Sequence, residues 1–384
     1  MPDLRRLAAR ATCALSLASL GYTAFALVRT LAFAKRPLQP ATRAPHVTIL
    51  KPLHGDEPLL VQKLASFCDQ EYPHFDVVMG TRAAGDVALE AARAVARDHP
   101  GIATVVHAAA STPHYPNPKA ATLAALVPHA RGEIIVFADS DMRVTPEYLL
   151  AVAAPFEDPA VGAVTCLYRG EPAGGGAASA LGAMANHEHF APSVLVAESL
   201  MGMRFGFGAT IAVRRALFER IGGLAAIGSH IADDATLCRL VREAGFRVVL
   251  SRYVVENVVD EPTLAALWEH ELRWARTHRA LEPAGYAGLA ITYPIPLALL
   301  HLALARNRAK ALAVVAAAFA LRFALSAATR AAFGVRSAPQ PLLIPLRDAF
   351  GLAVWAAAFA SRRVAWSGET LALADNGTVT RAGR

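Results

Sequence analysis

Asp139 and Asp141 are the first residues whose type and spacing suggest chemistry. They stand one residue apart, directly after a β-branched and aromatic run at 134–137 that predicts a buried parallel strand. In an open α/β sheet, ligands bind outside the carboxyl ends of the strands, so both carboxylates would face a crevice and could bind a divalent cation. Such an ion could bridge the phosphates of a nucleotide. The alternative is that Asp139 caps a helix starting near Thr145 while Asp141 is solvated.

A second acidic pair, Asp233 and Asp234, opens an amphipathic stretch at 231–244 that predicts a helix. Acids are ordinary at the start of a helix because they complement its dipole. Two together near the end of a sheet domain are also candidates for a catalytic base. Just before them, residues 205–214 (FGFGATIAVR) predict a strand entered through two glycines, which would let the backbone approach a ligand closely.

The segments that must position these acids alternate between strand and helix patterns from residue 46 onward. This alternation predicts a mostly parallel, doubly wound α/β sheet with right-handed crossovers. The predicted strands are residues 46–53, 76–81, 103–107, 134–137, 161–168 and 205–214, and the predicted helices are residues 58–69, 84–98, 119–130, 146–156, 231–244 and 263–280.

Composition points to a membrane and away from nucleic acid. Of the 384 residues, 54% are apolar, which is high for a purely soluble protein. Acidic and basic residues balance up to about residue 261, so the formal net charge of +7 originates in the apolar C-terminal third. That distribution suits anionic lipid headgroups. The first two thirds hold no basic stripe interleaved with aromatic residues, which argues against a nucleic-acid partner.

The cysteines and paired histidines do not suggest a metal centre. The cysteines contain no C-x-x-C pair, so neither a zinc site nor a disulfide framework is indicated, and a reducing cytoplasm is compatible with them. His187 and His189 are two residues apart in a helical stretch, where their side chains would face different sides. The cysteines are Cys13, Cys68, Cys166 and Cys238.

Four apolar stretches are long enough to cross a membrane. The first, residues 12–34, is flanked by basic residues and is long for a cleaved signal peptide, which is the competing interpretation. Arg322 and the pair Arg347 and Asp348 lie in later stretches, where charges are costly, so they could mark helix contacts or an acceptor groove. The last stretch could instead be re-entrant or interfacial. The later stretches are residues 283–305, 309–332 and 341–360.

Between the α/β region and these stretches lies a basic amphipathic helix containing Trp268 and Trp274. Such a helix would lie in the membrane interface, although an ordinary packed surface helix has the same pattern. The predicted division of the chain is an N-terminal anchor at 1–36, a catalytic domain at 45–261, an interfacial helix at 262–282, membrane helices at 283–361 and a polar tail at 362–384.

An ordered set of motifs between residue 46 and about residue 300 resembles the ceramide glucosyltransferase group of processive-type family 2 glycosyltransferases. Two further stretches, TCLYRG at 165–170 and the extension of HELRW to HELRWARTHRALEPAGYAG, are most similar to the hopanoid-biosynthesis members of that group. The ordered motifs are ILKPLHGDEP at 49–58, NPK at 117–119, ADSDMRV at 138–144, FGFGAT at 205–210, IADDATLCRLV at 231–241 and HELRW at 270–274.

The resemblance implies a glycosyltransferase-A fold, a UDP-sugar donor, an inverting single displacement and a lipid acceptor. Asp141 would hold an Mg²⁺ or Mn²⁺ ion that bridges the diphosphate, and Asp139 would support the donor nucleotide and the same metal. Asp234 would be the general base on the acceptor hydroxyl. Arg273 and Trp274 match the end of a signature that closes over the diphosphate.

Two positions depart from the pattern of the group. Ala83 replaces the first acid of a stretch near the end of the second strand, so contacts to uracil would fall to Asp86 or to backbone groups. His270 stands where the group often has Gln or Arg, and the hopanoid-related members share this histidine. Lys119 could add a positive charge to the diphosphate site, or it could be solvated.

The implied activity is transfer of N-acetylglucosamine from its UDP form to a hopanoid such as bacteriohopanetetrol. The implied location is a bacterial inner membrane, crossed several times, with the catalytic domain in the cytoplasm. Alternatives are a ceramide acceptor with UDP-glucose, and a catalytically silent scaffold, which Ala83 would favour. If residues 283–305 cross fully, Arg306, Arg308 and Lys310 would lie outside, against the positive-inside tendency, so a re-entrant segment or a short hairpin is also considered.

Overall fold

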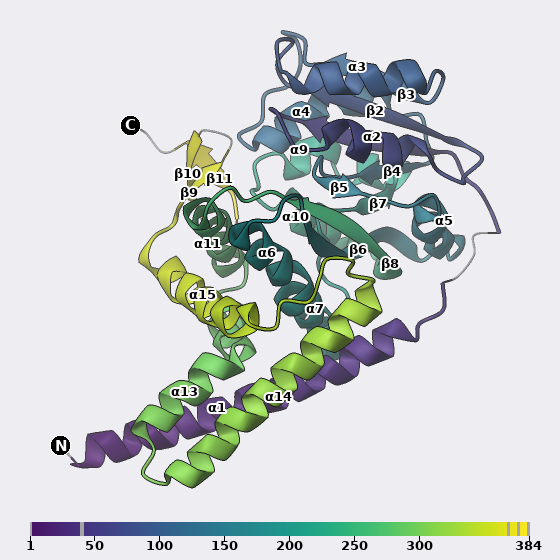
Figure 1. Ribbon diagram of the computed structural model, residues 1–384. Coiled ribbons are helices and arrows are strands. Elements are labelled where there is room, and N and C mark those ends of the chain that lie inside the picture. Colours follow the sequence, from purple (N-terminus) through teal and green to yellow (C-terminus); the bar gives the residue numbers. More distant parts are fainter. Residues whose placement is uncertain (1, 39–41, 367–368, 375–376, 382–384) are drawn as a thin grey trace. The chain divides into compact units, whose positions relative to one another are not determined.

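A computed structural model describes residues 2–38, 42–366, 369–374 and 377–381 of the chain. These residues form two compact units, each assembled from three separate stretches (Figure 1). The sheet unit comprises the described residues of Pro37–Arg169, Met201–Asp260 and Ser367–Arg384, and the helical unit comprises those of Met1–Arg36, Gly170–Leu200 and Glu261–Trp366.

The sheet unit is built on an eight-stranded sheet with the order β3-β2-β1-β4-β7-β6-β8-β5. The first four strands in this order are parallel to one another, as the alternating pattern predicted. Strand β7 runs antiparallel between β4 and β6, and β5 runs antiparallel to β8. The strands are β1 Val47–Leu53, β2 Phe75–Thr81, β3 Ala103–His107, β4 Ile134–Phe137, β5 Met142–Arg143, β6 Val161–Pro172, β7 Ile211–Arg214 and β8 Arg247–Val259.

Strand β1 lies inside the sheet with all seven residues buried, although it contains Lys51 and Pro52. Its pairing with β4 ends at Leu50 opposite Phe137, whereas its pairing with β2 continues to Leu53. Pro52 is therefore beyond the end of β4, where its missing N–H leaves no gap in the ladder. Because β1 continues beyond the end of β4, Lys51 lies next to the residues that follow β4.

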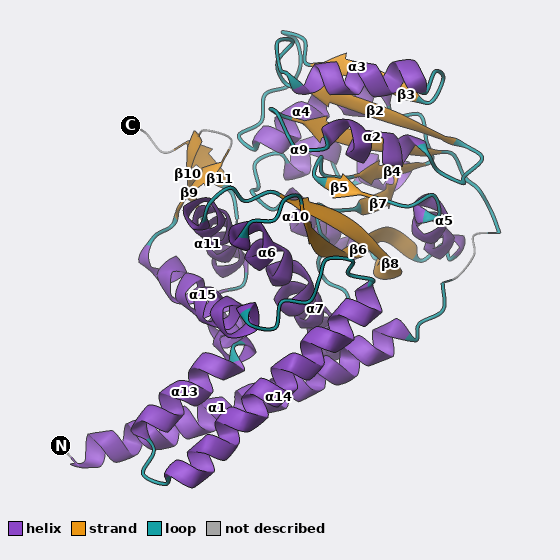
Figure 2. Ribbon diagram, in the orientation of Figure 1, coloured by secondary structure: helices purple, strands orange, loops and turns teal. Residues whose placement is uncertain are grey.

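Helices pack on the sheet and enclose one main core (Figure 2). Apart from Lys119 and Thr122, helix α4 consists of apolar residues, and eight of its nine residues are buried because it lies between the sheet and other helices. Buried side chains from the sheet, such as Leu50 and Val213, pack with Leu123 of α4 and Leu237 of α10. The helices are α2 Leu60–Cys68, α3 Ala88–Asp98, α4 Pro118–Leu126, η1 Val127–His129, α5 Tyr148–Ala153, η2 Ala154–Glu157, α8 Arg215–Arg220, α9 Gly223–Ile227 and α10 Asp233–Glu243.

The predicted strand at 205–214 is wrong in its first half, because only β7, Ile211–Arg214, is extended. Phe207 and Thr210 instead form an isolated bridge across a tight turn. The physical reason is the close packing of this turn, since a Cβ atom on Gly206 would stand 2.5 Å from the sulfur of Cys238. Strand β6 is longer than predicted and continues to Pro172.

The helical unit holds most of the apolar helices, and its N-terminal helix α1 is part of the packed structure. Ser16, Ser19, Thr23 and Thr30 are at most 1% exposed, and they form a polar stripe along α1 that faces its neighbours. The helices and strand are α1 Pro2–Ala34, α6 Ala177–Met184, the π-helical turn η3 Ala185–Phe190, α7 Ala191–Met201, α11 Leu264–Leu281, α12 Pro283–Gly288, η4 Leu289–Thr292, α13 Pro294–Leu304, α14 Arg308–Phe333, α15 Leu343–Ala357, η5 Ala358–Ala360 and β9 Arg363–Trp366.

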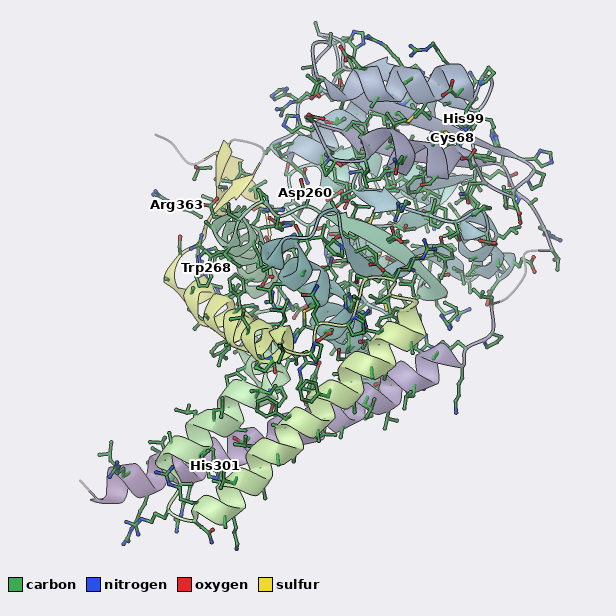
Figure 3. The ribbon with its side chains drawn as sticks, viewed as in Figure 1. Cys68, His99, Asp260, Trp268, His301 and Arg363 are labelled. Carbon is green, nitrogen blue, oxygen red and sulfur yellow. The ribbon has the colours of Figure 1, made fainter. Side chains whose placement is uncertain are left out.

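Helix α1 runs alongside α13 and α14 (Figure 1). Its hydroxyl groups donate to backbone carbonyls of the facing segment, Ser16 to Leu297 at 3.1 Å and Ser19 to Ile291 at 2.6 Å. Thr12 lies 3.3 Å from the ring of His301, which Figure 3 labels on α13. These hydrogen bonds show that this face of α1 packs against other helices of the unit and not against lipid.

Within the described part of the chain, three helices are long and apolar enough to cross a membrane: Leu4–Ala34, Arg308–Phe333 and Leu343–Ala360. The predicted span at 283–305 is not one straight helix, because Pro283–Thr292 and Pro294–Leu304 meet at an angle of 71°. The break falls at Tyr293, whose φ of −113° and ψ of 71° are not helical. A residue before a proline is displaced from helical geometry by the proline ring, so Pro294 accounts for the break.

The polar tail, for which the sequence predicted no structure, contributes β10, Glu369–Leu373, and β11, Val379–Arg381, which pair antiparallel. The four cysteines are free, and Cys68, Cys166 and Cys238 are buried. Among the described residues no group of three His, Cys, Asp or Glu side chains is arranged to hold a metal by itself.

Candidate active site

The turn that follows β4 carries Asp139 and is fixed by backbone contacts on two sides. The N–H of Asp139 donates to the carbonyl of Gly208 at 3.1 Å. The carbonyl of Asp139 accepts a hydrogen bond from the ammonium of Lys51. Lys51 is fully buried and its Nζ stands 3.8 Å from the ring centre of Phe67. Burial lowers the pKa of Lys51 to about 7, although the nearby carboxylates of Asp141 and Asp139 oppose the shift.

A second support beneath this turn is the pair of Glu57 and Lys63. Glu57 accepts from the hydroxyl of Ser140 and lies 2.6 Å from the ammonium of Lys63, which is 1% exposed. Lys51, Glu57 and Lys63 were not predicted to be site residues. For Lys51 and Glu57 the available signal was their position in the ILKPLHGDEP motif, but only the register of β1 shows that this motif lies under the Asp139 turn.

Asp141 has one carboxylate oxygen that is satisfied and one that is not. Its Oδ2 accepts from Nδ2 of Asn257 at 2.6 Å, and its carbonyl accepts from the N–H of Val258 at 3.0 Å. Its Oδ1 is buried with no hydrogen-bond partner among the described residues. Burial, followed by the charges of Asp139 and Glu57, raises the pKa of Asp141 to about 6.

The free carboxylate oxygen of Asp141, Oδ1, is consistent with the prediction that Asp139 and Asp141 bind a divalent cation. A buried carboxylate oxygen without a donor is costly, and a divalent ion is one group that would satisfy it. In the part of the chain that the structure describes, no third His, Cys, Asp or Glu side chain joins Asp139 and Asp141 as a ligand, so the remaining ligands of an ion would have to be water and the oxygens of a bound substrate. Phosphate oxygens serve Mg²⁺ in this way.

Lys119 lies beside Asp139, so the interpretation of Lys119 as a solvated side chain is excluded. Its Nζ is 2.7 Å from Oδ1 of Asp139 and 3.6 Å from Oδ2 of Asp233, and the side chain is 13% exposed. Burial disfavours its charged form, but the carboxylates outweigh burial and hold the pKa of Lys119 above its usual value. The lysine is on the first turn of α4, which Asn117 caps by accepting from the N–H groups of Lys119 and Ala120.

Asp233 and Asp234 are the first two residues of α10. Asp234 and Asp139 both form hydrogen bonds with the backbone of Gly208. The N–H of Gly208 donates to Oδ2 of Asp234 at 2.9 Å, while its carbonyl accepts from Asp139. Any side chain at Gly208 would collide with the carboxylate of Asp139 and stand 3.0 Å from Nζ of Lys119, so glycine is required there. Burial, followed by the charge of Asp233, raises the pKa of Asp234 to about 7.

Asp86 is engaged outside this cluster of carboxylates. Its Oδ1 accepts from the N–H of Gly55 at 2.9 Å and from that of Ala88 at 3.0 Å, and its Oδ2 lies 3.1 Å from the ring of His54. Burial opposes ionisation, but these hydrogen bonds outweigh it and lower the pKa of Asp86. Its carboxylate is therefore occupied by the chain itself, and a role in binding a nucleotide base stays a prediction.

His270, Arg273 and Trp274 lie together on α11 of the helical unit. Nδ1 of His270 is 2.6 Å from Oε1 of Glu261, and its ring meets Trp274 edge-on with centres 4.5 Å apart. The indole of Trp274 is 39% exposed, and Trp268 on the same helix is labelled in Figure 3. Their predicted contacts with the donor stay a prediction.

The chain is similar to known glycosyltransferases. The model of glycosyl transferase family 21 matches residues 11–379. Ceramide glucosyltransferase 1 of Caenorhabditis elegans is 20% identical over 247 residues, which are 64% of this chain and 52% of that protein. The chain thus spans about half the length of this relative.

The solved structures that are similar to the chain include a mannosyltransferase and TarS. The mannosyltransferase PcManGT from Pyrobaculum calidifontis, in complex with GDP-Man and Mn²⁺, has a TM-score of 0.53 and 24% identity, covering 91% of this chain and 98% of that chain. Residues 1–349 of S. aureus TarS in complex with UDP-GlcNAc have a TM-score of 0.41 and 17% identity, covering 88% of this chain and 99% of that chain. The mannosyltransferase confirms the predicted glycosyltransferase-A fold.

The predicted relation to ceramide glucosyltransferases is confirmed, while the family number is corrected from 2 to 21. The matched residues extend from α1 through the acidic cluster to the C-terminal strands, so they include both units of the structure. The chain belongs to glycosyl transferase family 21.

Proposed function

We propose that the chain is an inverting glycosyltransferase that moves a sugar from a UDP-linked donor to a hydroxyl group of a membrane lipid. The observation that carries the proposal is that Asp234 and Asp139 both form hydrogen bonds with the backbone of Gly208. The pKa of Asp234 is raised to about 7, and Asp139 forms an ion pair with Lys119. A base that titrates near neutral pH and a fixed cation nearby are the two groups that a single displacement with a diphosphate leaving group needs.

Asp234 would accept the proton of the attacking hydroxyl. Hydrogen bonds from Gly208 at 2.9 Å and Ala235 at 2.7 Å fix the orientation of its carboxylate, which keeps the proton acceptor aimed at one place. Lys119 would stabilise the negative charge that develops on the departing diphosphate. A divalent cation held by Asp139 and Asp141 would neutralise further charge on that group.

The donor is proposed to be UDP-N-acetylglucosamine, with Asp86 or backbone groups near Ala83 contacting the base. His270, Arg273 and Trp274 would contact the diphosphate side of the donor from α11. The support for this part is the likeness of the sequence motifs, and the ceramide glucosyltransferase relative supports a lipid acceptor. The acceptor is proposed to be a hopanoid such as bacteriohopanetetrol.

The apolar helices support a location in a membrane, proposed to be a bacterial inner membrane with the sheet unit in the cytoplasm, where UDP-sugars are made. The break at Tyr293 supports the re-entrant alternative for residues 283–305. A short hairpin of this kind would leave Arg306, Arg308 and Lys310 on the side favoured by the positive-inside tendency.

The test is mass spectrometry of lipid products from the full chain in detergent. The assay supplies Mn²⁺ or Mg²⁺, UDP-glucose and UDP-N-acetylglucosamine together, and both bacteriohopanetetrol and ceramide. A hopanoid carrying one N-acetylhexosamine is the expected product. A hexosylceramide product would change the proposed donor to UDP-glucose and the proposed acceptor to ceramide, with the same type of reaction. Wild-type protein that releases no UDP with any pair of donor and acceptor would favour the silent scaffold.

Asp234→Asn tests the base in the same assay. The amide can still accept from Gly208 but cannot take a proton, so UDP release should fall about 10²–10⁴-fold. Asp98→Asn, on the exposed side of α3, is the control and should behave as wild type. Equal activity of Asp234→Asn and wild type would exclude this role for Asp234.

A further inference from the structure

The loop Gly228–Ile231, which leads into the acids of α10, is held from both sides by residues distant in sequence. On one side, the N–H of Asn117 donates to the carbonyl of Gly228 at 3.2 Å and its Nδ2 donates to the carbonyl of His230 at 2.8 Å. On the other side, the N–H of Ile231 donates to the carbonyl of Gly377 at 3.0 Å.

The second side is completed by β11 itself. The N–H of Val379 donates to the carbonyl of Ser229 at 2.9 Å, and His230 and Thr378 form an antiparallel bridge. The carbonyls of Gly228 and His230 thus accept from Asn117, whereas Ser229 and Ile231 bond to Val379 and Gly377. The loop is therefore fixed from two sides by segments that are distant in the sequence.

Asn117 also determines the position of Lys119. It is fully buried, and its Oδ1 accepts from the N–H groups of Lys119 and Ala120 at 2.8 and 3.2 Å. Its Oδ1 and Nδ2 therefore act on different elements: the oxygen caps α4 and the amide nitrogen holds the loop before α10. A displacement of the loop relative to α4 would separate Lys119 from Asp233, which are 3.6 Å apart.

We propose that Asn117 and β11 are positioning elements of the active site, which clamp Gly228–Ile231 so that Asp234 and Lys119 keep their places. The inference rests on the proposed function for Asp234. Neither Asn117 nor β11 touches a reacting atom in this account. Their effect on catalysis passes through the loop and the first turn of α10.

Asn117→Asp separates the two tasks of the asparagine. The carboxylate still caps α4, but it cannot donate to His230 and places an oxygen against that carbonyl. We expect kcat for UDP release to fall at least tenfold with a smaller change in donor KM. The control is Thr122→Val, which removes the side-chain hydrogen bond to Pro118 at 3.2 Å in the same helix without reaching the loop, and should keep wild-type kcat.

Val379→Pro tests the other side, because proline lacks the N–H that donates to Ser229. Val379→Ala keeps that donor and loses side-chain packing, so it controls for stability. We expect kcat to fall more in Val379→Pro than in Val379→Ala, and the combination with Asn117→Asp to cost less than the product of the single effects, since both act on one loop.

Hydrogen exchange at the amide of Ile231 in the full chain reports the clamp without catalysis. Slow exchange in wild type and faster exchange in both Asn117→Asp and Val379→Pro are expected. Wild-type protein that protects this amide but releases no UDP would contradict the proposed function and not the clamp. Active wild type whose kcat is unchanged in Asn117→Asp and Val379→Pro would overturn the positioning role, as would an unprotected Ile231 amide in wild type.

Discussion

Nζ of Lys119 lies 2.7 Å from Oδ1 of Asp139 and 3.6 Å from Oδ2 of Asp233. One ammonium group therefore joins the acid after β4 to an acid at the start of α10. Without this charge, the carboxylates of Asp139 and Asp233 would face each other across the same small space, which is unfavourable. The ammonium group of Lys119 offsets their repulsion, and its charge is available to an incoming diphosphate.

Lys119→Met should lower kcat for UDP release by about 10²-fold, because a fixed positive group at a developing anion is usually worth that much. Donor KM should also rise, since the ground-state diphosphate loses a partner. Steady-state kinetics of UDP release would measure both constants. Lys310→Gln, an exposed substitution at the start of α14, is the control, and a Lys119→Met enzyme with wild-type constants would contradict the assignment.

The activity should depend on pH through Asp234, whose pKa is raised to about 7 by burial and by Asp233. The ionised form is the base, so kcat/KM should decrease as pH falls below about 7 and level off above it. An unperturbed aspartate would keep full activity down to about pH 4. A pH profile of UDP release at saturating cation distinguishes the two, and an acidic limb near pH 4 would count against Asp234 as base.

Removal of divalent cation with a chelator should abolish UDP release, and Mn²⁺ or Mg²⁺ should restore it. Asp141→Asn should raise the cation concentration needed for half-maximal activity at least tenfold, because the neutral amide is a poorer ligand than a carboxylate. A proton competes for Asp141, whose pKa is raised to about 6, so cation affinity should weaken below that pH. Binding of Mn²⁺ followed by electron paramagnetic resonance measures this without catalysis.

Arg322 in α14 is 1% exposed and contacts Asp348 of α15 at 2.9 Å and Glu188 of the π-helical turn at 3.2 Å. Arg322→Met should destabilise the protein by about 3–5 kcal/mol, because it removes the guanidinium partner of two buried carboxylates and, among the described residues, leaves them with only Ser326 and His189. Thermal unfolding in detergent would show the loss. Adding Asp348→Leu should recover part of it, whereas the exposed substitution Arg306→Gln should have little effect; an unchanged Arg322→Met would refute the contribution of this ion pair.

The sequence predicted those strands and helices whose spacing of apolar residues matches the face that they bury. The strand at 103–107 and the helix containing Asp234 agree with β3 and α10 within two residues. Asp139 and Asp141 were recognisable because they follow an unbroken apolar strand. The break at Tyr293 had a local signal as well, since Pro294 follows it, but apolar composition alone does not distinguish a straight span from a bent one.

The supports of the site were not predictable, because they depend on contacts between distant segments. Asn257 meets Asp141 only because β8 pairs with β5 at that register. Lys51 would ordinarily be placed on a surface, and its burial depends on β4 being shorter than β1. The role of residues 377–381 had no local signal, since a short polar tail has the same composition whether or not it pairs with a loop.

The polar stripe of α1 has a consequence for the biogenesis of the protein. Ser16 bonds to Leu297, a residue 281 positions later in the chain. At a synthesis rate of about 5–20 residues per second, α1 waits roughly 15–60 s for this partner to be made. During that time its hydroxyl groups can bond only to the carbonyls of their own helix, as Thr23 does with Ser19. Assembly of the helical unit therefore cannot be completed before α13 has been made, late in the synthesis of the chain.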